Sequence, residues 1–396
     1  MRSVIPALLL AAALVPLAAV AADDNPLKRC KNHYILRQLG CADVAAGWEQ
    51  AAPLRTYHGN HTATLLTDGR VLVAGDTGVP EMTAEIYDAT LDTWTLTAPM
   101  TRDRLGHTGT RLADGRVLVV GGEIPRSAMD WFPFEGSAEI FDPATNKWAA
   151  TGNLLTKRGG FTATLLPSGE VLVVGGYDGG DDSLASAELY DPVAGHWRAA
   201  APMGIARFWH TATSLPDGNV LVVGGWYDDM FQMQVRETEL YDWKSGTWMT
   251  AGTITGRGSH SSTLLDDGRV VVAGGYTSGF KPDGWRLFWT LDTADIFDPA
   301  TREWKDAGDI GTPRYGHLAA PLRGGGAMIV QGTQSYDQVP NVHYRYVPNA
   351  VTYSDAPGGW IDDGLPAVEM NATTVTRLGD GTLLFVGQNH AVLYRY

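Results

Sequence analysis

Cysteine is nearly absent from this sequence, whose 396 residues include only Cys30 and Cys41. A chain of this length with 44% hydrophobic residues can bury a sizeable core, so it is not a small scaffold that depends on disulfides. In an oxidising compartment we expect the two cysteines to pair, because closing so short a loop stabilises a fold by about 2–3 kcal/mol. The alternative, a metal site built on two thiolates, lacks the usual short spacing between cysteines.

Basic residues are also few, with 30 Lys and Arg against 44 Asp and Glu and a formal net charge of −14. Proteins that bind nucleic acid through its phosphates carry an excess of positive charge. We therefore expect no nucleic-acid partner.

Long apolar runs are missing beyond the first residues. Residues 1–22 contain Arg2, a short apolar run and the small residues AVAA at the end, which is typical of a secretory signal peptide. A membrane anchor is the alternative, but Pro6 and Pro16 interrupt the run and it is short for a span. We predict a periplasmic or secreted protein without a transmembrane segment, in which residues 23–45 form an extension that carries the disulfide.

Tryptophan recurs about every fifty residues, at Trp48, Trp94, Trp148, Trp197, Trp248, Trp304 and Trp360. Between successive tryptophans the same order of segments returns: an alternating segment such as HTATLL, a DG turn, an apolar run such as RVLVVGG, a loop, and a segment such as AEIYDP. The alternating segment and the apolar run each predict a β-strand, and the DG turn predicts a tight reversal of the chain between them. Each unit therefore predicts four short antiparallel strands, and the chain is all-β.

A four-stranded sheet cannot bury both of its faces alone, so the units must stack, and stacking them into a ring leaves only short edges. Six units are complete, whereas a seventh ends at Tyr396 after three strands. The missing strand is available near Trp48. We predict that residues 46–396 form a seven-bladed β-propeller, closed by three C-terminal strands and one N-terminal strand.

The repeat resembles the kelch motif. The resemblance rests on the spaced tryptophans, on the glycine pairs Gly121-Gly122, Gly175-Gly176, Gly224-Gly225 and Gly274-Gly275, and on Tyr87-Asp88, Phe141-Asp142, Tyr190-Asp191, Tyr241-Asp242 and Phe297-Asp298. It extends from about Trp48 to the C-terminus and implies a kelch β-propeller. Three blades depart from the glycine pair, with Gly75-Asp76, Gly332-Thr333 and Gly387-Gln388.

Aromatic residues gather in the loops of one predicted face. The loops between the second and third strands emerge on the same face as the connections between blades, and they are long in blades two to six. Aromatic side chains on one surface can form a stacking platform for carbohydrate or a protein-binding site. We predict that this face binds a glycan or an extracytoplasmic protein through Trp131, Phe132, Trp209, Trp226, Tyr227, Trp285, Trp289, Arg207 and Arg314. Alternatively, the indoles fill gaps beneath the loops.

Arginine recurs three residues before the start of the first strand, at Arg104, Arg158, Arg207, Arg257 and Arg314. Such a ring could hold a carboxylate or an acidic sugar, and in some kelch adaptors the corresponding arginines hold an acidic peptide. However, the third strand begins with an acid in blades one to five, and an acid in one blade is followed by an arginine in the next. We therefore favour salt bridges between neighbouring blades.

The repeat lapses where blades six, seven and one meet. His58, His343 and Glu369 lie in this sector, and a histidine with a carboxylate could perform acid and base catalysis. An irregular seam at the closing blade is the alternative, which we favour.

Two further patterns suggest metal ligands. His61, His107, His210, His260 and His317 recur at one repeat position, and we predict that they are buried structural partners. Asp178, Asp181 and Asp182 could bind calcium, although they lack the spacing of a known calcium loop and a solvated turn is the better interpretation.

We conclude from the sequence that the chain is an exported binding module, and we expect a monomer without a cofactor. The alternative is a cofactor-free enzyme acting on a sugar, such as an epimerase or mutarotase of an acidic sugar, which the kelch resemblance also allows. The copper-radical oxidases of similar fold require a cysteine crosslinked to a tyrosine, and no cysteine lies between Trp48 and Tyr396. That chemistry is therefore disfavoured.

Overall fold

The computed structural model describes residues 47–75, 82, 84–123, 134–180, 183–227, 233–280, 286–338, 341–355, 359–362 and 372–395, without the side chains of 280, 286, 336–338 and 341–343. The chain divides into the units Met1–Ala46 and Gly47–Tyr396, and the description concerns the second. Among the described residues the only regular elements are strands, which confirms the all-β prediction.

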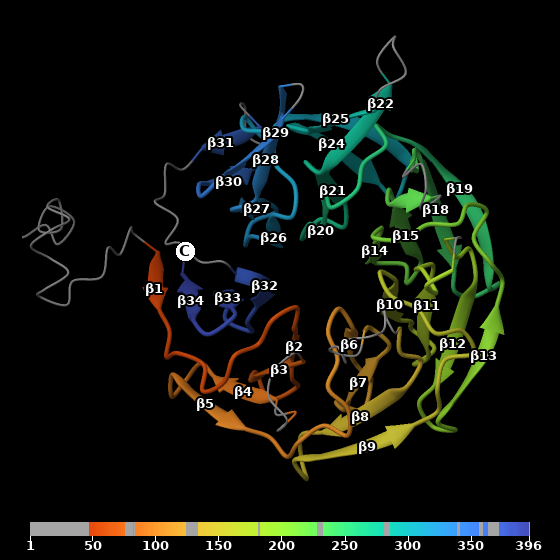
Figure 1. The fold of residues 1–396 in the computed structure, drawn as a ribbon, viewed down its shortest axis with the longest axis vertical. Coiled ribbons are helices and arrows are strands. Elements are labelled where there is room, and N and C mark those ends of the chain that lie inside the picture. The colour runs from red at the N-terminus through yellow and green to blue at the C-terminus, as the bar shows by residue number, and fades with distance from the viewer. Residues whose placement is uncertain are drawn as a thin grey trace, which may run out of the picture. The chain divides into compact units, whose positions relative to one another are not determined.

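Seven sheets of four antiparallel strands are arranged around a central axis (Figure 1). The strands nearest the axis are β2 (Thr62–Leu65), β6 (Thr108–Arg111), β10 (Thr162–Leu165), β14 (Thr211–Ser214), β20 (Ser261–Leu264), β26 (Leu318–Pro321) and β32 (Ala372–Arg377). The second strands are β3 (Val71–Ala74), β7 (Val117–Val120), β11 (Val171–Val174), β15 (Val220–Val223), β21 (Val270–Ala273), β27 (Ala327–Val330) and β33 (Leu383–Gly387). Blades one to seven are numbered here by these strands in chain order.

The outer half of each blade holds the third and fourth strands. The third strands are β4 (Glu85–Asp88), β8 (Ala138–Asp142), β12 (Ala187–Asp191), β18 (Glu237–Asp242), β24 (Thr293–Asp298), β30 (Ala350–Tyr353) and β34 (Ala391–Tyr394). The outermost strands are β5 (Thr93–Leu96), β9 (Lys147–Thr151), β13 (His196–Ala200), β19 (Thr247–Thr253), β25 (Glu303–Asp309), β31 (Trp360–Asp362) and β1 (Trp48–Gln50).

The ring closes through the two ends of the propeller. In blade seven, β1 pairs antiparallel with β34, so that Trp48 lies opposite Tyr394 and Gln50 opposite Val392. The sheet order β1-β34-β33-β32 contains three C-terminal strands and one N-terminal strand. The predicted seven blades and the predicted mode of closure are both confirmed.

The core lies between the blades, and the second strands are its centre. Every residue of β7 and β11 is buried, as the near-continuous apolar runs predict. The turns before these strands reverse the chain tightly because glycine accepts a left-handed backbone, as Gly69 does at φ 88°. Asp68 reinforces that turn by accepting a hydrogen bond from the amide of Arg70 at 3.1 Å.

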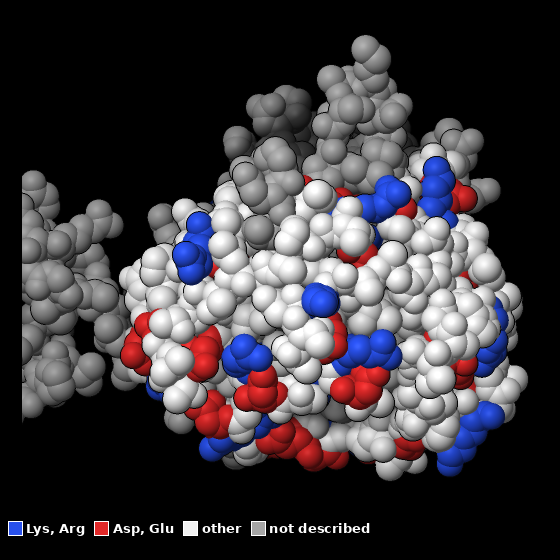
Figure 2. Space-filling model, turned by 90° about the horizontal axis from the view of Figure 1, so that it is seen from below, with Lys and Arg blue, Asp and Glu red and all other residues white. Residues whose placement is uncertain are grey.

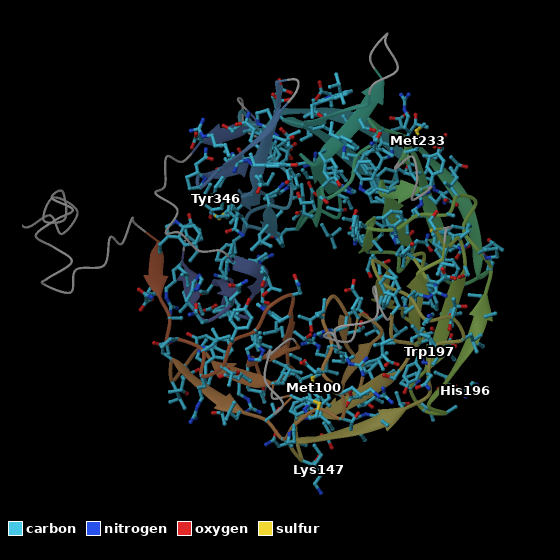
Figure 3. The ribbon with its side chains drawn as sticks, viewed as in Figure 1. Met100, Lys147, His196, Trp197, Met233 and Tyr346 are labelled. Atoms are coloured by element: carbon cyan, nitrogen blue, oxygen red, sulfur yellow. The ribbon has the colours of Figure 1, made fainter. Side chains whose placement is uncertain are left out.

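In blades one to six the spaced tryptophan donates a hydrogen bond to the segment before its blade, whereas the indole nitrogen of Trp48 in blade seven has no partner among the described residues. Tyr190 and Trp197 face each other on the third and fourth strands of blade three, with ring centroids 4.9 Å apart, and Figure 3 shows Trp197 on the outermost strand. The indole of Trp197 donates a hydrogen bond to the carbonyl of Gly152 in the preceding blade at 2.8 Å. This double contact gives a physical reason for the tryptophan period.

Within the described residues, three blades carry an extra hairpin in the loop between the second and third strands. The hairpin strands are β16 (Trp226–Tyr227) with β17 (Met233–Gln234), β22 (Tyr276–Phe280) with β23 (Arg286–Thr290), and β28 (Thr333–Gln338) with β29 (Asn341–Tyr346). Figure 3 labels Met233 and Tyr346, which belong to the first and third of them. Neighbouring hairpins are joined by a 2.7 Å hydrogen bond from the Gln234 amide to Ser278.

The described surface has charges of both signs. On the side shown in Figure 2, Lys and Arg side chains lie among Asp and Glu side chains rather than in separate patches. Pairs such as Arg70 with Asp68 and Arg116 with Asp114, both at 2.7 Å, contribute to this mixture. No helix formed by the described residues is long and apolar enough to cross a membrane.

Candidate functional site

The arginines of the repeat are buried and paired. Arg158 is 0% exposed, and its guanidinium donates to Glu188 at 2.6 Å and to the carbonyl of Gly175 at 2.7 Å. Arg207 is equally buried and donates to Glu239 at 2.6 Å. These groups neutralise the guanidinium inside the fold, so the structure does not present Arg207 to an outside ligand.

Each of these ion pairs lies within one blade, and the predicted bridges between blades are wrong. The chain enters a blade at the edge where the second strand ends and the third begins, so the guanidinium reaches across its own sheet. The pairs are Arg104 with Glu139, Arg158 with Glu188, Arg207 with Glu239 and Arg257 with Asp295.

In blade one a histidine replaces the arginine, and in blade six an asparagine replaces the acid. A count of charges therefore made pairing within a blade seem to fail in these two blades. His58 occupies the arginine position of blade one, and its Nε2 lies 3.2 Å from Glu85. Arg314 in blade six donates instead to the backbone carbonyl and the side-chain oxygen of Asn349, both at 2.9 Å. Arg314 is also 0% exposed, and burial lowers its pKa to about 10.

His58 is therefore part of a buried structural pair. Burial alone would raise the pKa of Glu85, but hydrogen bonds from His58, from Thr56 and from two backbone amides outweigh it and lower that pKa. The backbone of His343 pairs with Tyr336 in the hairpin of blade six, and its side chain lies outside the described part. Glu369 lies outside the described residues altogether.

The repeated histidines link neighbouring blades, which confirms that they are buried partners. His107 and His210 donate or accept through Nε2 at 3.0 Å from Thr62 and Thr162 of the preceding blades. Burial lowers the pKa of each of these two histidines to about 3, so both rings are neutral near pH 7. Blade three has Phe161 at this position.

The replacement of histidine by Phe161 leaves a neighbour without its usual partner. The hydroxyl of Thr108 in blade two is buried and makes no hydrogen bond, because the side chain opposite it is a phenyl ring. Phe161 is itself buried, and Gly121 makes room for its ring: a Cβ there would lie 2.7 Å from Phe161.

The predicted aromatic residues fall into three groups. Trp226 is 1% exposed and packs against Tyr276 with ring centroids 4.6 Å apart, so it fills space beneath a hairpin. Trp209, Trp289 and Tyr227 are 56%, 43% and 37% exposed. Trp131, Phe132 and Trp285 lie outside the described residues.

Trp209 stands in a backbone conformation that suits glycine. Its φ is 50°, in the left-handed region that bulky side chains rarely occupy. The equivalent residues of blades one, two, three, five and six are also left-handed, and they are Asn60, Gly106, Gly160, Ser259 and Gly316. Among these six described blades, only blade four places a large aromatic residue at this position.

Local contacts hold Trp209 in place while its indole remains exposed. The Trp209 amide donates to the carbonyl of Gly160 at 2.8 Å, and the Phe208 ring centroid lies 5.1 Å from that of Trp209. A Cβ on Gly160 would lie 2.9 Å from the indole, so the glycine of blade three leaves room for it. The ring thus rests on the neighbouring loop.

A hollow of about 340 Å³ lies beside Trp209, at the edge where the loops enter the first strands of blades two to five. Its lining residues are Gly106, Glu123, Gly159, Gly160, Phe161, Trp209, His210, Thr211 and His260. Three of them depart from the repeat. Besides Trp209 and Phe161, Glu123 follows the glycine pair of blade two, where blades three to five have Tyr177, Trp226 and Tyr276.

The three departures bring together a partly exposed indole, a phenyl ring and a carboxylate. Ligand pockets commonly combine aromatic walls with a few convergent polar groups, and both polar and aromatic side chains line this hollow. Backbone hydrogen bonds between Glu123 and Leu105, at 2.8 and 3.0 Å, fix the position from which the carboxylate projects. The arrangement can stack one face of a ring-shaped ligand on the exposed indole of Trp209.

Sequence reasoning identified Trp209 but missed Glu123 and Phe161. The signal was available, because aligning the units with one another shows GGE where other blades have GGY or GGW, and RGGF where others have an arginine three residues before a histidine. The missed residues differ from the repeat, as Trp209 does, whereas the predicted Arg207 and Arg314 conform to it.

Of the three aspartates considered as calcium ligands in the loop of blade three, only Asp178 lies among the described residues. Asp178 accepts a hydrogen bond from the amide of Gly180 at 2.8 Å, as in a simple turn, and Asp181 and Asp182 lie outside the described residues. In the described part of the chain, no three or more His, Cys, Asp and Glu side chains are grouped so that they could hold a metal ion.

Comparison with known proteins indicates a kelch-type repeat and a propeller fold. The family model described as the kelch motif matches residues 161–204. The structure of YjhT has a TM-score of 0.59 and 13% identity, over 78% of this chain and 99% of YjhT. A fungal alcohol oxidase of the AA5 family, in complex with copper, has a TM-score of 0.66 and 18% identity, over 88% of this chain and 76% of the oxidase. No curated protein sequence matches the chain.

At these identities the likeness to solved structures concerns the fold.

Proposed function

This chain is a kelch-repeat β-propeller, and from that premise we propose that it is a binding module whose ligand, a glycan, occupies the hollow beside Trp209. The observation that carries the proposal is the left-handed backbone of Trp209, at φ 50°, together with its 56% exposure. A strained residue that gains little burial contributes little to folding, and such strain is commonly retained where a ligand uses the side chain. An exposed indole is suited to stacking against a sugar ring.

Blades two, three and six have glycine at the position of Trp209, and this residue provides a test of the proposal. We expect Trp209→Gly to change the free energy of unfolding by no more than about 1 kcal/mol, because relief of backbone strain offsets the lost contacts of the indole. The same variant should lose glycan binding. Urea unfolding and binding to an immobilised set of neutral, amine-bearing and acidic oligosaccharides measure the two quantities.

Trp289→Ala is the matched control, since Trp289 is 43% exposed but lies on a hairpin of blade five, away from the hollow's lining. We expect this variant to bind as the wild type does. Glycan binding that survives Trp209→Gly, or the absence of binding to any glycan, would overturn the proposal. Turnover of a bound sugar would make the chain an enzyme instead.

We also propose that the protein is exported and monomeric. The signal-like pattern of residues 1–22 supports export. N-terminal sequencing of protein recovered from the periplasm or medium should begin near residue 22 or 23, and size-exclusion chromatography with light scattering should give the mass of one chain. An intact N-terminus in a cytoplasmic fraction would contradict export.

A further inference from the structure

The phenyl ring of Phe161 indicates which kind of sugar ring enters the hollow, an inference that rests on the proposed function. Phe161 is 7% exposed and lines the hollow together with Trp209. It also belongs to a core cluster of blades two and three that includes Leu118 and Val171. The side chain is therefore part of both the core and the wall of the hollow.

Histidine would satisfy the polar groups at this position better than phenylalanine does. Five other blades have histidine there, and each imidazole Nε2 lies 2.8–3.0 Å from a hydroxyl of the preceding blade. The hydroxyl that precedes blade three in this way is that of Thr108, which is buried without a partner. Leaving a buried polar group unpaired costs stability. The chain thus carries an unpaired hydroxyl that the repeat's usual residue would pair.

The space at this position does not require a phenyl ring. A Cβ on Gly121 would lie 2.7 Å from Cε1 of Phe161, and a Cβ on Gly175 would lie 2.7 Å from Cε1 of His210. The phenyl and the imidazole therefore approach the glycine of the preceding blade equally closely. Departures from a local rule that lower stability are commonly found where function uses the residue. We therefore look to the hollow for the role of Phe161.

Trp209 and Phe161 come from adjacent blades and give the hollow two aromatic surfaces. Trp209 is 56% exposed, so its indole can stack against one face of a sugar ring. The negative face of an aromatic ring attracts the slightly positive hydrogens of C–H groups and disfavours hydroxyl oxygens. Two such surfaces favour a sugar ring that is apolar on more than one side.

We propose that the hollow recognises hexopyranose units whose hydroxyls are all equatorial, with Trp209 stacked on one face of the ring and Phe161 against C–H groups on another side. Equatorial hydroxyls lie around the rim of a pyranose ring and leave C–H groups on both of its faces. An axial hydroxyl places a polar group on one face, where it meets an aromatic surface. The ligand class is thus glycans of the glucose configuration, and Phe161 sets the preference.

The experiment compares two uncharged ligands of equal length by calorimetry, a β-1,4-linked glucose tetramer and a β-1,4-linked mannose tetramer, whose units differ in one hydroxyl that is axial in mannose. We expect the glucose tetramer to bind at least about fivefold more tightly, as an additional aromatic contact contributes. Phe161→His should reduce this preference to less than about twofold. The same variant should not lower the urea midpoint, because Thr108 gains a partner.

Two further variants keep the test decisive. Thr108 is not among the residues that line the hollow, and Thr108→Val removes the unpaired hydroxyl at nearly constant shape. This control should raise the urea midpoint and leave the preference for the glucose tetramer unchanged. Phe161→Leu keeps an apolar side chain in the core cluster but removes the aromatic ring, so it should lose the preference even if the histidine variant does not fold.

The outcomes separate the two proposals. A preference for the glucose tetramer that requires both Trp209 and Phe161 supports the present inference. Binding that requires Trp209 but prefers the mannose tetramer, shows no preference, or keeps its preference in both Phe161 variants overturns this inference and leaves the proposed function standing. The same holds if another glycan binds through Trp209 and the glucose tetramer does not. If no glycan binds, or if binding ignores Trp209, both proposals fail.

Discussion

The repeat supplies an internal comparison for single residues, because one backbone position occurs in several blades. At the arginine position, four guanidiniums face a carboxylate, one faces an asparagine, and blade one has His58. All these side chains are fully buried, so each must find polar partners inside the fold. His58 is buried and has a polar partner inside the fold, so it belongs to the scaffold. Trp209 is more than half exposed and does not meet this criterion.

Replacing His58 should reveal this structural role. His58→Ala removes the donor that Glu85 uses at 3.2 Å, and we expect a loss of about 1–3 kcal/mol in the free energy of unfolding, because a buried carboxylate then has fewer partners. His58→Arg restores the repeat's residue and should be close to the wild type. Equal urea midpoints for His58→Ala and the wild type would contradict the assignment.

The sheet of blade seven is formed from two separate parts of the chain rather than from a single repeat unit. Blade seven depends on β1, whose residues precede those of β34 by more than three hundred positions. Backbone hydrogen bonds and the packing of Trp48 against Tyr394, with centroids 4.8 Å apart, hold this closure together. The other six blades each fold from contiguous sequence.

Removing β34 should therefore unfold more than one strand. A chain that ends at Gly387 leaves β1 without a partner and β33 paired with β32 alone, and we expect loss of the cooperative thermal transition in circular dichroism. A chain that begins at residue 46 keeps β1 and serves as the control, which should melt as the full chain does. A monomeric, cooperatively melting Gly387 truncation would refute this account of closure.

For the whole molecule, the ring of neutral histidines makes stability depend on pH. The pKa of His61 is lowered to about 4 and those of His107, His210 and His317 to about 3, chiefly by burial. In the unfolded chain these groups titrate near 6.5. Between those values the unfolded chain binds protons that the folded chain does not, so the stabilisation present above about pH 6.5 is lost as the pH falls.

We expect the free energy of unfolding to decrease from pH 7 to pH 5, with each histidine contributing up to about 1.4 kcal/mol per pH unit once the pH is below its unfolded pKa. Urea unfolding across this range measures the slope. A His317→Asn variant should show a slope smaller by about one proton. A flat profile between pH 7 and pH 5 would contradict the neutral ring.

Much of the fold was predictable because the same sequence pattern recurs in each unit of the repeat. Seven spaced tryptophans, the DG turns and the missing strand near Trp48 predicted the blade count and the closure, and the structure confirms both. The arginine pairing was predicted wrongly, since counting charges along the chain does not show which sheet edge a guanidinium reaches. Of the residues that line the candidate hollow, the sequence indicated only Trp209 as a ligand contact, and that assignment remains a prediction.

The sequence by itself determined the strands, their order and the number of blades, because these follow from local alternation, turn residues and the repeat period. Only the tertiary structure decided which polar groups meet. Glu123, Phe161 and Trp209 come from three different blades, and their approach depends on how the blades pack around the axis. Contacts between neighbouring sheets are set by packing geometry rather than by spacing along the chain, so the hollow emerges only when blades two to five pack against one another.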